Sequence, residues 1–275
     1  MIAFPNAKIN LGLNIIRKRN DGFHDIETVM FPIALCDVLE IMESNAGATV
    51  FNCTGLAIDS NNGITAGTKN IVIRLYELLK MDFDLPAVHI HLHKVIPIGA
   101  GLGGGSSDCT HAIMLLNNLF NLALTKDQML QYVSQLGSDC AFFIENKPAL
   151  ATGRGEKLQP LTLKLGGYYL YLIKPPVHIN TAQAYSWTTA SGYGQPLLDT
   201  MERPVSEWKN ILLNAFEKPV FERHPEAKKI KDRLYEIGAL YASMSGSGSA
   251  IFGLFDHEPE IIGFPDGYFQ WIGKL

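Results

Sequence analysis

The sequence has little charge, and this shortage excludes several classes of protein. Charged residues make up 18% of the 275 residues, below the roughly 25% usual for soluble domains, while 47% are apolar. A chain with this balance buries a sizeable core, and its length allows two modest domains. The formal net charge of -4 gives no general attraction to nucleic acid or to an anionic membrane. We therefore expect a globular protein that holds any anionic ligand in a local site.

Cysteine is also scarce, and no long apolar run is present. Cysteines occur only at Cys36, Cys53, Cys109 and Cys140. They form no CxxC pair, which favours reduced thiols over a secreted disulfide framework. The stretch MIAFPNAKIN carries Pro5 and Lys8 where a signal peptide requires an unbroken apolar run, and no later segment reaches membrane-spanning length. We expect a cytoplasmic protein with no membrane partner, present as a monomer or weak homodimer.

What the sequence does have is a glycine-rich loop between two periodic segments. Val88, Ile90 and Leu92 alternate with histidines, which predicts a half-buried strand running toward Pro97. Apolar residues at helical spacing predict an amphipathic helix over about 106–121. Between them lies PIGAGLGGGSSD, with five glycines in the seven positions from 99 to 105. Because glycine is costly to order, such a run indicates close approach of the backbone to a ligand.

Further signals organise the rest of the chain. A helix is predicted over 71–79, and Thr125 with Gln128 forms a capping-box pattern for a helix that ends at Gly137. YYLYLIKPP predicts a strand, 208–216 and 226–237 predict helices, and LYASMSGSGSAIFGLF predicts two strands around a small-residue turn. We place a domain boundary near residue 155, which gives an ATP-binding domain over 1–155 and a second domain over 156–275.

The glycine loop matches neither of two common nucleotide motifs in full. It satisfies G-x-G-x-x-G, but the following helix leads to another helix start and not to a second parallel strand. It also lacks the Gly-Lys-Ser/Thr that ends a Walker A loop. Backbone N–H groups at a helix start still favour a phosphate, and a merely structural turn needs only one or two glycines. The predicted phosphate-site residues are Pro97, Gly99, Ala100, Gly101, Leu102, Gly103, Gly104, Gly105, Ser106 and Ser107.

Three stretches together resemble a known superfamily. They are PNAKINLGLNIIRKRNDGFHDIETV, PIGAGLGGGSSD and MSGSGSAIFGLF, and in this order they resemble the three motifs of the GHMP kinases. The resemblance continues through NIVIRLYELL, LGSDCAFF, ATGRGEKLQPL and NTAQAY, and it is strongest to the kinases of the non-mevalonate isoprenoid pathway. It implies an α/β (α+β) fold of two domains with the active site in the cleft between them. The implied reaction is ATP-dependent phosphorylation of the 2-hydroxyl of 4-diphosphocytidyl-2-C-methyl-D-erythritol.

The resemblance also implies catalytic residues. Asp139 in LGSDCAFF matches the family's catalytic base, and Lys8 in PNAKINL matches the lysine that pairs with that aspartate and the reacting hydroxyl. On local sequence alone, Asp139 could instead be a helix N-cap after Gly137, and Lys8 could be a surface lysine at a strand edge. Asn10 lies on the same face of the predicted strand as Lys8 and could orient the substrate.

A cytidine ring is held by stacking and by hydrogen bonds to the base edge. Phe23 and His24 match the family's base-recognition pair, and Tyr185 matches its second stacking ring. Thr181 matches a further substrate contact. The family more often has tyrosine at the Phe23 position, so a hydroxyl contact is lost here. Phe23 in core packing and His24 as a turn residue are the alternatives.

Metal binding has two separate aspects in this sequence. His89, His91 and His93 share one strand face and could suggest zinc, but we expect a solvated strand face because no other ligand is motif-linked to them. Mg²⁺ is expected with ATP, and no acidic cluster identifies its ligands.

Two other functions compete with the leading one. Another small-molecule GHMP kinase, of the homoserine or mevalonate type, is disfavoured by the cytidine set of Phe23, His24 and Tyr185. A noncatalytic nucleotide-binding regulator should show decay of Lys8 or Asp139, and both are present.

Overall fold

The structure is a computed structural model that describes residues 1–44, 47–56, 70–189, 192 and 197–275. The chain forms two compact units, each assembled from separate stretches. Unit 1 comprises Met1–Ala7, Leu35–Ile98 and Gly103–Asn146, and unit 2 comprises Lys8–Ala34, Gly99–Leu102 and Lys147–Leu275. Because each unit combines stretches from different parts of the chain, this division differs in kind from a single boundary along the sequence. The domain boundary near residue 155 therefore stays a prediction.

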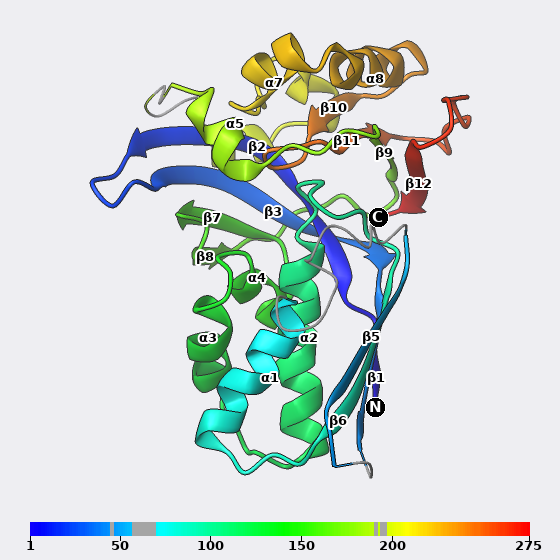
Figure 1. Cartoon of the computed structure of the whole chain (residues 1–275). Coiled ribbons are helices and arrows are strands. Elements are labelled where there is room, and N and C mark those ends of the chain that lie inside the picture. Colours follow the sequence, from blue (N-terminus) through cyan, green and yellow to red (C-terminus); the bar gives the residue numbers. More distant parts are fainter. Residues whose placement is uncertain (45–46, 57–69, 190–191, 193–196) are drawn as a thin grey trace. The chain divides into compact units, whose positions relative to one another are not determined.

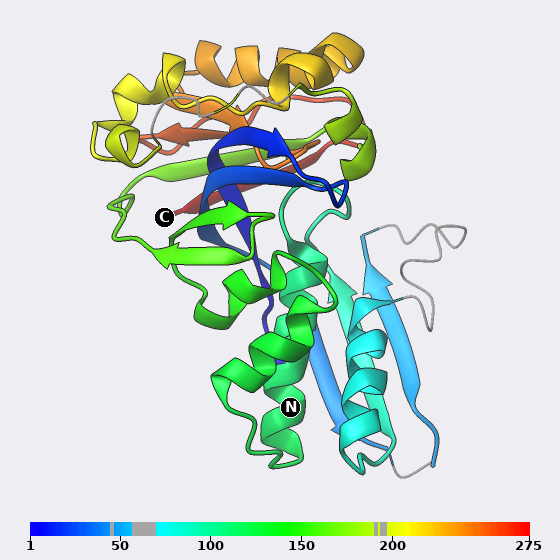
Figure 2. The same cartoon turned by 90° about the vertical axis from the view of Figure 1, so that its left-hand side faces the viewer.

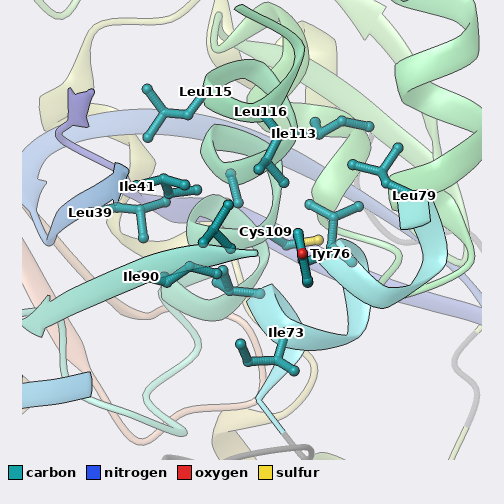
Figure 3. Packing of buried hydrophobic residues seen from close by; sticks show 14 of the residues in the cluster. Leu39, Ile41, Ile73, Tyr76, Leu79, Ile90, Cys109, Ile113, Leu115 and Leu116 are labelled. Carbon is teal, nitrogen blue, oxygen red and sulfur yellow. The ribbon is translucent and has the colours of Figure 1, made fainter. Parts of the chain in front are cut away.

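Unit 1 packs helices against a four-stranded sheet (Figure 1). The strand order is β1-β4-β6-β5, with bounds Ile2–Ala3, Val38–Glu43, Val88–Lys94 and Val50–Gly55. The helices are α1 (Ile71–Asp82), α2 (Gly104–Leu119), α3 (Lys126–Ser134) and α4 (Cys140–Glu145). Figure 3 shows the core between them, where Leu39 and Ile90 of the sheet meet Tyr76 of α1 and Ile113 of α2.

Local sequence signals account for these elements. In β6 the apolar residues are buried and His89, His91 and His93 are exposed, which confirms the predicted half-buried strand. Asn70 caps α1 by accepting a hydrogen bond from the Val72 N–H at 2.9 Å. The predicted capping box before α3 is present, although the helix ends at Ser134, before Gly137. The predicted helix after the glycine loop is α2, which starts two residues earlier than expected.

Unit 2 contains most of one four-stranded sheet and the whole of another. One has the order β2-β3-β7-β8, with bounds Asn6–Lys18, His24–Cys36, Ala149–Gly153 and Lys157–Pro160. The other has the order β10-β11-β9-β12, with bounds Tyr241–Met244, Ile251–Phe255, Tyr169–Lys174 and Phe269–Lys274. The helices are α5 (Thr181–Ser186), α6 (Leu197–Met201), the 3₁₀ helix η2 (Val205–Asn210), α7 (Glu217–Arg223) and α8 (Pro225–Glu236). Figure 2 shows α7 and α8 along one face of the second sheet.

The sheet signals of unit 2 are confirmed, and one helix prediction is wrong. β10 and β11 form the predicted antiparallel pair, and β9 is the predicted strand before Pro175. The expected helix over 208–216 is absent from the described chain: η2 ends at Asn210 and α7 begins at Glu217. The intervening backbone pairs with β2, because Leu13 N donates to the Leu213 carbonyl at 2.9 Å and Ala215 N donates to the Leu13 carbonyl at 2.9 Å. Strand pairing therefore overrides helical periodicity. Among the described residues, no helix is long and apolar enough to cross a bilayer.

Candidate active site

Lys8 and Asn10 project from one face of β2 in unit 2. Lys8 is 3% exposed, so its interpretation as a surface lysine is wrong. Its Nζ donates to Asn10 Oδ1 at 2.6 Å and to the Gly101 carbonyl at 3.1 Å. Asn10 Nδ2 in turn donates to Thr28 Oγ1 at 3.0 Å. These two contacts fix the position of the ammonium next to the glycine loop.

The glycine loop meets the third small-residue motif at Gly101. Ser245 Oγ donates to the Gly101 carbonyl at 2.8 Å, and Ala250 N donates to the Ala100 carbonyl at 3.1 Å. A Cβ on Gly101 would lie 2.0 Å from the Ser245 carbonyl oxygen, and φ is +77°, so only glycine fits here. Asn10 N also donates to Ser245 Oγ at 3.2 Å. Parts of the three motifs thus form one cluster inside unit 2.

The remainder of the glycine loop starts α2 in unit 1. Gly103 occupies the N-cap position with φ 71°, and no side chain caps the helix there. A helix start of this kind can offer its first N–H groups to an anion, and the helix dipole favours negative charge. Gly105 is exposed, and a Cβ added there would meet nothing within 4 Å. This geometry fits a phosphate group.

The other predicted loop residues have different surroundings. Pro97 and Leu102 are buried, and the Leu102 carbonyl accepts a hydrogen bond from Lys8 N at 2.9 Å. Gly99 is exposed, and a Cβ there would clash with the His178 ring at 2.3 Å. Ser107 is fully buried, and its Oγ lies 3.4 Å from His111 Nδ1. Its hydroxyl therefore contacts a side chain within unit 1. A phosphate contact by Ser107 or by the half-buried Ser106 stays a prediction.

Asp139 lies at the start of α4, in unit 1. It occupies the N-cap position, as the local-sequence alternative predicted. Its side chain makes no capping hydrogen bond, so that alternative does not account for the role of the carboxylate. The start of α4 is tied to α2, because Thr110 Oγ1 donates to the Cys140 carbonyl at 2.9 Å. A Cβ on Gly137 would lie 3.3 Å from Ser106 Oγ. Asp139 is therefore held near the glycine-rich start of α2, and its pairing with Lys8 stays a prediction.

An aromatic cluster in unit 2 contains the predicted cytidine residues. The rings of His24 and Tyr185 stack with centroids 4.6 Å apart and an interplanar angle of 11°. Phe216 packs edge-on against Tyr185 at 4.9 Å. Burial lowers the pKa of His24, with a further contribution from Lys18, which favours an imidazole that can both donate and accept at neutral pH.

Phe23 and Thr181 complete the predicted substrate set. Phe23 is 54% exposed, which contradicts its interpretation as core packing. The Arg154 guanidinium lies 4.9 Å from the Phe23 ring centroid. Thr181 begins α5, one helical turn before Tyr185, and its Oγ1 lies 3.2 Å from Ser247 Oγ.

Sequence reasoning missed three residues of these clusters. Ser245 and Arg154 lie inside the quoted stretches MSGSGSAIFGLF and ATGRGEKLQPL, which were recognised as motifs without a role for either side chain. Thr28 lies at the end of the first motif, and nothing in the local pattern distinguishes it from an ordinary strand threonine. Each of the three acts on a residue far away in sequence, so only the tertiary structure reveals it.

The histidine strand has a polar partner. Thr54 Oγ1 lies 3.0 Å from His91 Nε2 and 3.0 Å from His93 Nδ1. In the part of the chain that the structure describes, no group of three or more His, Cys, Asp or Glu residues could hold a metal ion.

Comparison with protein families gives two matches along the chain. The model described as GHMP kinases N terminal domain matches residues 70–147, and the one described as GHMP kinases C terminal matches residues 199–262. A relative from Parabacteroides distasonis named 4-diphosphocytidyl-2-C-methyl-D-erythritol kinase is 47% identical over 100% of both chains. A relative of the same name from Bacteroides fragilis strain ATCC 25285 is 48% identical over 95% of this chain and 94% of its own.

Solved structures agree with these matches. A crystal structure of 4-(cytidine 5'-diphospho)-2C-methyl-D-erythritol kinase is 29% identical with a TM-score of 0.76, over 92% of this chain and 90% of that one. The mevalonate kinase of Methanococcus jannaschii is 12% identical with a TM-score of 0.67, over 92% of this chain and 90% of that one, and it shares the fold. With two full-length relatives near half identity and both GHMP matches in order, this chain belongs to the 4-diphosphocytidyl-2-C-methyl-D-erythritol kinase family of the GHMP kinases.

Proposed function

We propose that the chain transfers the γ-phosphoryl group of ATP to the 2-hydroxyl of 4-diphosphocytidyl-2-C-methyl-D-erythritol, in the non-mevalonate pathway to isoprenoid precursors. The observation that carries the proposal at residue level is the buried Lys8 ammonium, anchored on the Gly101 carbonyl of the glycine loop. Phosphoryl transfer requires mainly positioning and charge stabilisation, and this contact joins a fixed positive charge to the loop that would bind the phosphates.

The start of α2 would bind the ATP phosphates. Its first backbone N–H groups and the exposed Gly105 give an anion room to approach without a side chain in the way. Mg²⁺, when bound, neutralises charge that develops on the phosphates, and it usually keeps several waters and few protein ligands. Such sparse ligation is compatible with a described chain that offers no cluster of three acidic or histidine side chains.

Asp139 would accept the proton of the attacking hydroxyl on a carboxylate oxygen. Its side chain makes no capping hydrogen bond at α4, so helix capping does not account for its presence. Lys8 would stabilise the developing alkoxide and keep the carboxylate ionised, since a nearby positive charge favours the charged form. Asn10 would orient both groups through its bond to Lys8.

The cytidine would lie against the aromatic cluster of unit 2. Tyr185 and the exposed Phe23 offer ring faces for stacking, and His24 offers ring nitrogens for the base edge. Thr181 would contact the same ligand from the start of α5. For the location and assembly of the protein, we keep the cytoplasm and a monomer or weak homodimer as proposals.

A product assay tests this function. ATP and Mg²⁺ are supplied with the cytidyl substrate and, in parallel, with mevalonate and with homoserine. We expect turnover of the cytidyl substrate alone. Equal or better turnover of either competitor would overturn the substrate assignment, and nucleotide binding without any turnover would favour a noncatalytic regulator.

A further inference from the structure

A buried ionic cluster lies beside the start of α2 and outside the site described above. It consists of Lys94 at the end of β6, Asp37 between β3 and β4, and Asp108 in α2. The side chains are 5%, 0% and 3% exposed. Lys94 Nζ donates to Asp108 Oδ2 at 2.6 Å and makes a very short contact with Asp37 Oδ2. All three residues belong to unit 1.

Stability alone is a poor explanation for this cluster. Taking three charged groups out of water is expensive, and well-packed apolar side chains often serve as well or better. Asp108 Oδ1 is buried, and within the described residues it has no hydrogen-bond partner. A buried carboxylate with an unsatisfied oxygen costs free energy, so the arrangement indicates a function beyond packing.

The cluster contacts the chain on both sides of the glycine loop. Asp37 Oδ1 accepts hydrogen bonds from Val95 N at 2.6 Å and from Ile96 N at 2.8 Å, directly before the loop. Asp108 lies in the second turn of α2, directly after it. Between the two, a Cβ on Gly104 would lie 3.4 Å from Lys94 Nζ and 2.9 Å from Ile96 Cγ2. Lys94 thus ties together both ends of this segment.

We propose that Lys94, Asp37 and Asp108 are positioning residues that set the first turn of α2 for phosphate binding. The inference rests on the proposed function, which assigns the ATP phosphates to that turn. Lys94 acts through the protein and not as a phosphate ligand, because its ammonium is bound by the carboxylates of Asp37 and Asp108. Directional bonds to a single ammonium fix orientation, whereas apolar packing of equal volume leaves freedom to shift.

The test compares two ways of removing the bonds. Asp108→Asn keeps the volume of the side chain and leaves Lys94 paired with Asp37. The double variant Lys94→Met with Asp108→Leu replaces the bonds with apolar packing and leaves Asp37 held by the Val95 and Ile96 N–H groups. Lys231→Met is the matched control, because Lys231 Nζ pairs with the partly buried Glu217 at 2.6 Å in unit 2. Calorimetry measures affinity for MgATP and for the cytidyl substrate, and thermal unfolding measures stability.

We expect both α2 variants to bind MgATP at least about fivefold more weakly while cytidyl affinity stays within about twofold of wild type, because the first turn of α2 loses the bonds that fix its orientation. The control should bind both ligands normally. A folded double variant with wild-type MgATP affinity would show that the cluster is only structural and would overturn the proposal. Failure of the wild-type protein to bind MgATP would instead refute the proposed function, so the two failures are distinct.

Discussion

Two buried lysines in this protein contact the glycine loop in different ways. In unit 2, Lys8 donates to the Asn10 side-chain amide and to the Gly101 carbonyl. In unit 1, Lys94 donates to the carboxylates of Asp37 and Asp108. The lysine of unit 2 is fixed on the glycine loop itself, whereas the lysine of unit 1 is fixed on a carboxylate that also accepts from the backbone just before the loop and on one just after it. The difference teaches that burial alone does not identify a catalytic lysine, because a buried ammonium can either contact the loop directly or support the backbone on both sides of it.

The largest expected effect tests the catalytic side of this comparison. Asp139→Asn keeps the shape of the side chain but cannot accept the proton, so kcat should fall by about 10²–10⁴ while both ligands still bind. Lys8→Ala should also lose rate, and the double variant should lose far less than the product of the single losses, because the two residues act as a unit.

Steady-state kinetics with separate binding measurements check this prediction. Lys174→Met is the control, since Lys174 Nζ also donates to backbone carbonyls, those of Pro175 and Val177, at 3.0 and 3.1 Å. Near-wild-type turnover in Asp139→Asn would remove this residue from the role of base.

The second prediction extends the catalytic side to the substrate. Tyr185→Ala removes one stacking ring and should weaken cytidyl-substrate binding by about 1–3 kcal/mol with little change in ATP affinity. His24→Ala should act on the same ligand through lost hydrogen bonds. Tyr268→Ala is the control, because Tyr268 stacks on Phe264 at 4.9 Å and belongs to no predicted site. Loss of ATP affinity with normal cytidyl binding would mean that the two ligand sites are reversed.

The third prediction separates neighbouring glycines at the start of α2. Gly103→Val should weaken ATP binding because it strains a positive φ, and Gly104→Val should do so by pushing Ile96 and Lys94.

Gly105→Ala is the sharper variant at this helix start. Its Cβ meets no protein atom within 4 Å, and alanine stabilises a helix by about 1 kcal/mol relative to glycine. We expect normal or higher thermal stability with weaker ATP binding by calorimetry. Gly263→Ala, also free of neighbours within 4 Å, serves as control. Unchanged ATP affinity in a folded Gly105→Ala protein would place the phosphates elsewhere.

The last prediction is a pH dependence of stability that comes from the Lys94 cluster. Burial raises the pKa of Asp108 to about 7, although the positive charge of Lys94 lowers it. Asp37 raises this pKa further, and the Cys53 thiol of β5 interacts electrostatically with the same carboxyl group. The folded state therefore keeps a proton that the unfolded chain loses near pH 4, as expected for an ordinary aspartate. Between these pH values the folded state binds more protons, so the free energy of unfolding falls as pH rises and levels off above about 7.

Urea unfolding at pH 5 and pH 8 measures this effect. Asp108→Asn removes the titration, so the decline in stability should be shallower in the variant; for one group it cannot exceed about 1.4 kcal/mol per pH unit. Identical pH profiles for the two proteins would show that Asp108 is ionised throughout this range.

Several structural elements of this protein could be predicted from local sequence. Alternation in β6, the capping box of α3 and the glycine run before α2 each depend on residues close in sequence, and the structure has all three elements. Motif order also identified the family. The helix predicted over 208–216 failed because its periodicity is local, whereas the pairing of Leu213 and Ala215 with Leu13 of β2 is not.

The amino-acid sequence by itself thus determined the periodic elements, the superfamily and the identity of Lys8 and Asp139 as candidates. Only the tertiary structure decided that Lys8 is anchored on Gly101, that Ser245 joins the same cluster, and that Arg154 lies over Phe23. It also decided that Lys94 pairs with Asp37 and Asp108. The physical reason is that helix and strand patterns report neighbours along the chain, whereas the partner of a buried charge comes from whichever distant segment folding brings within hydrogen-bond distance.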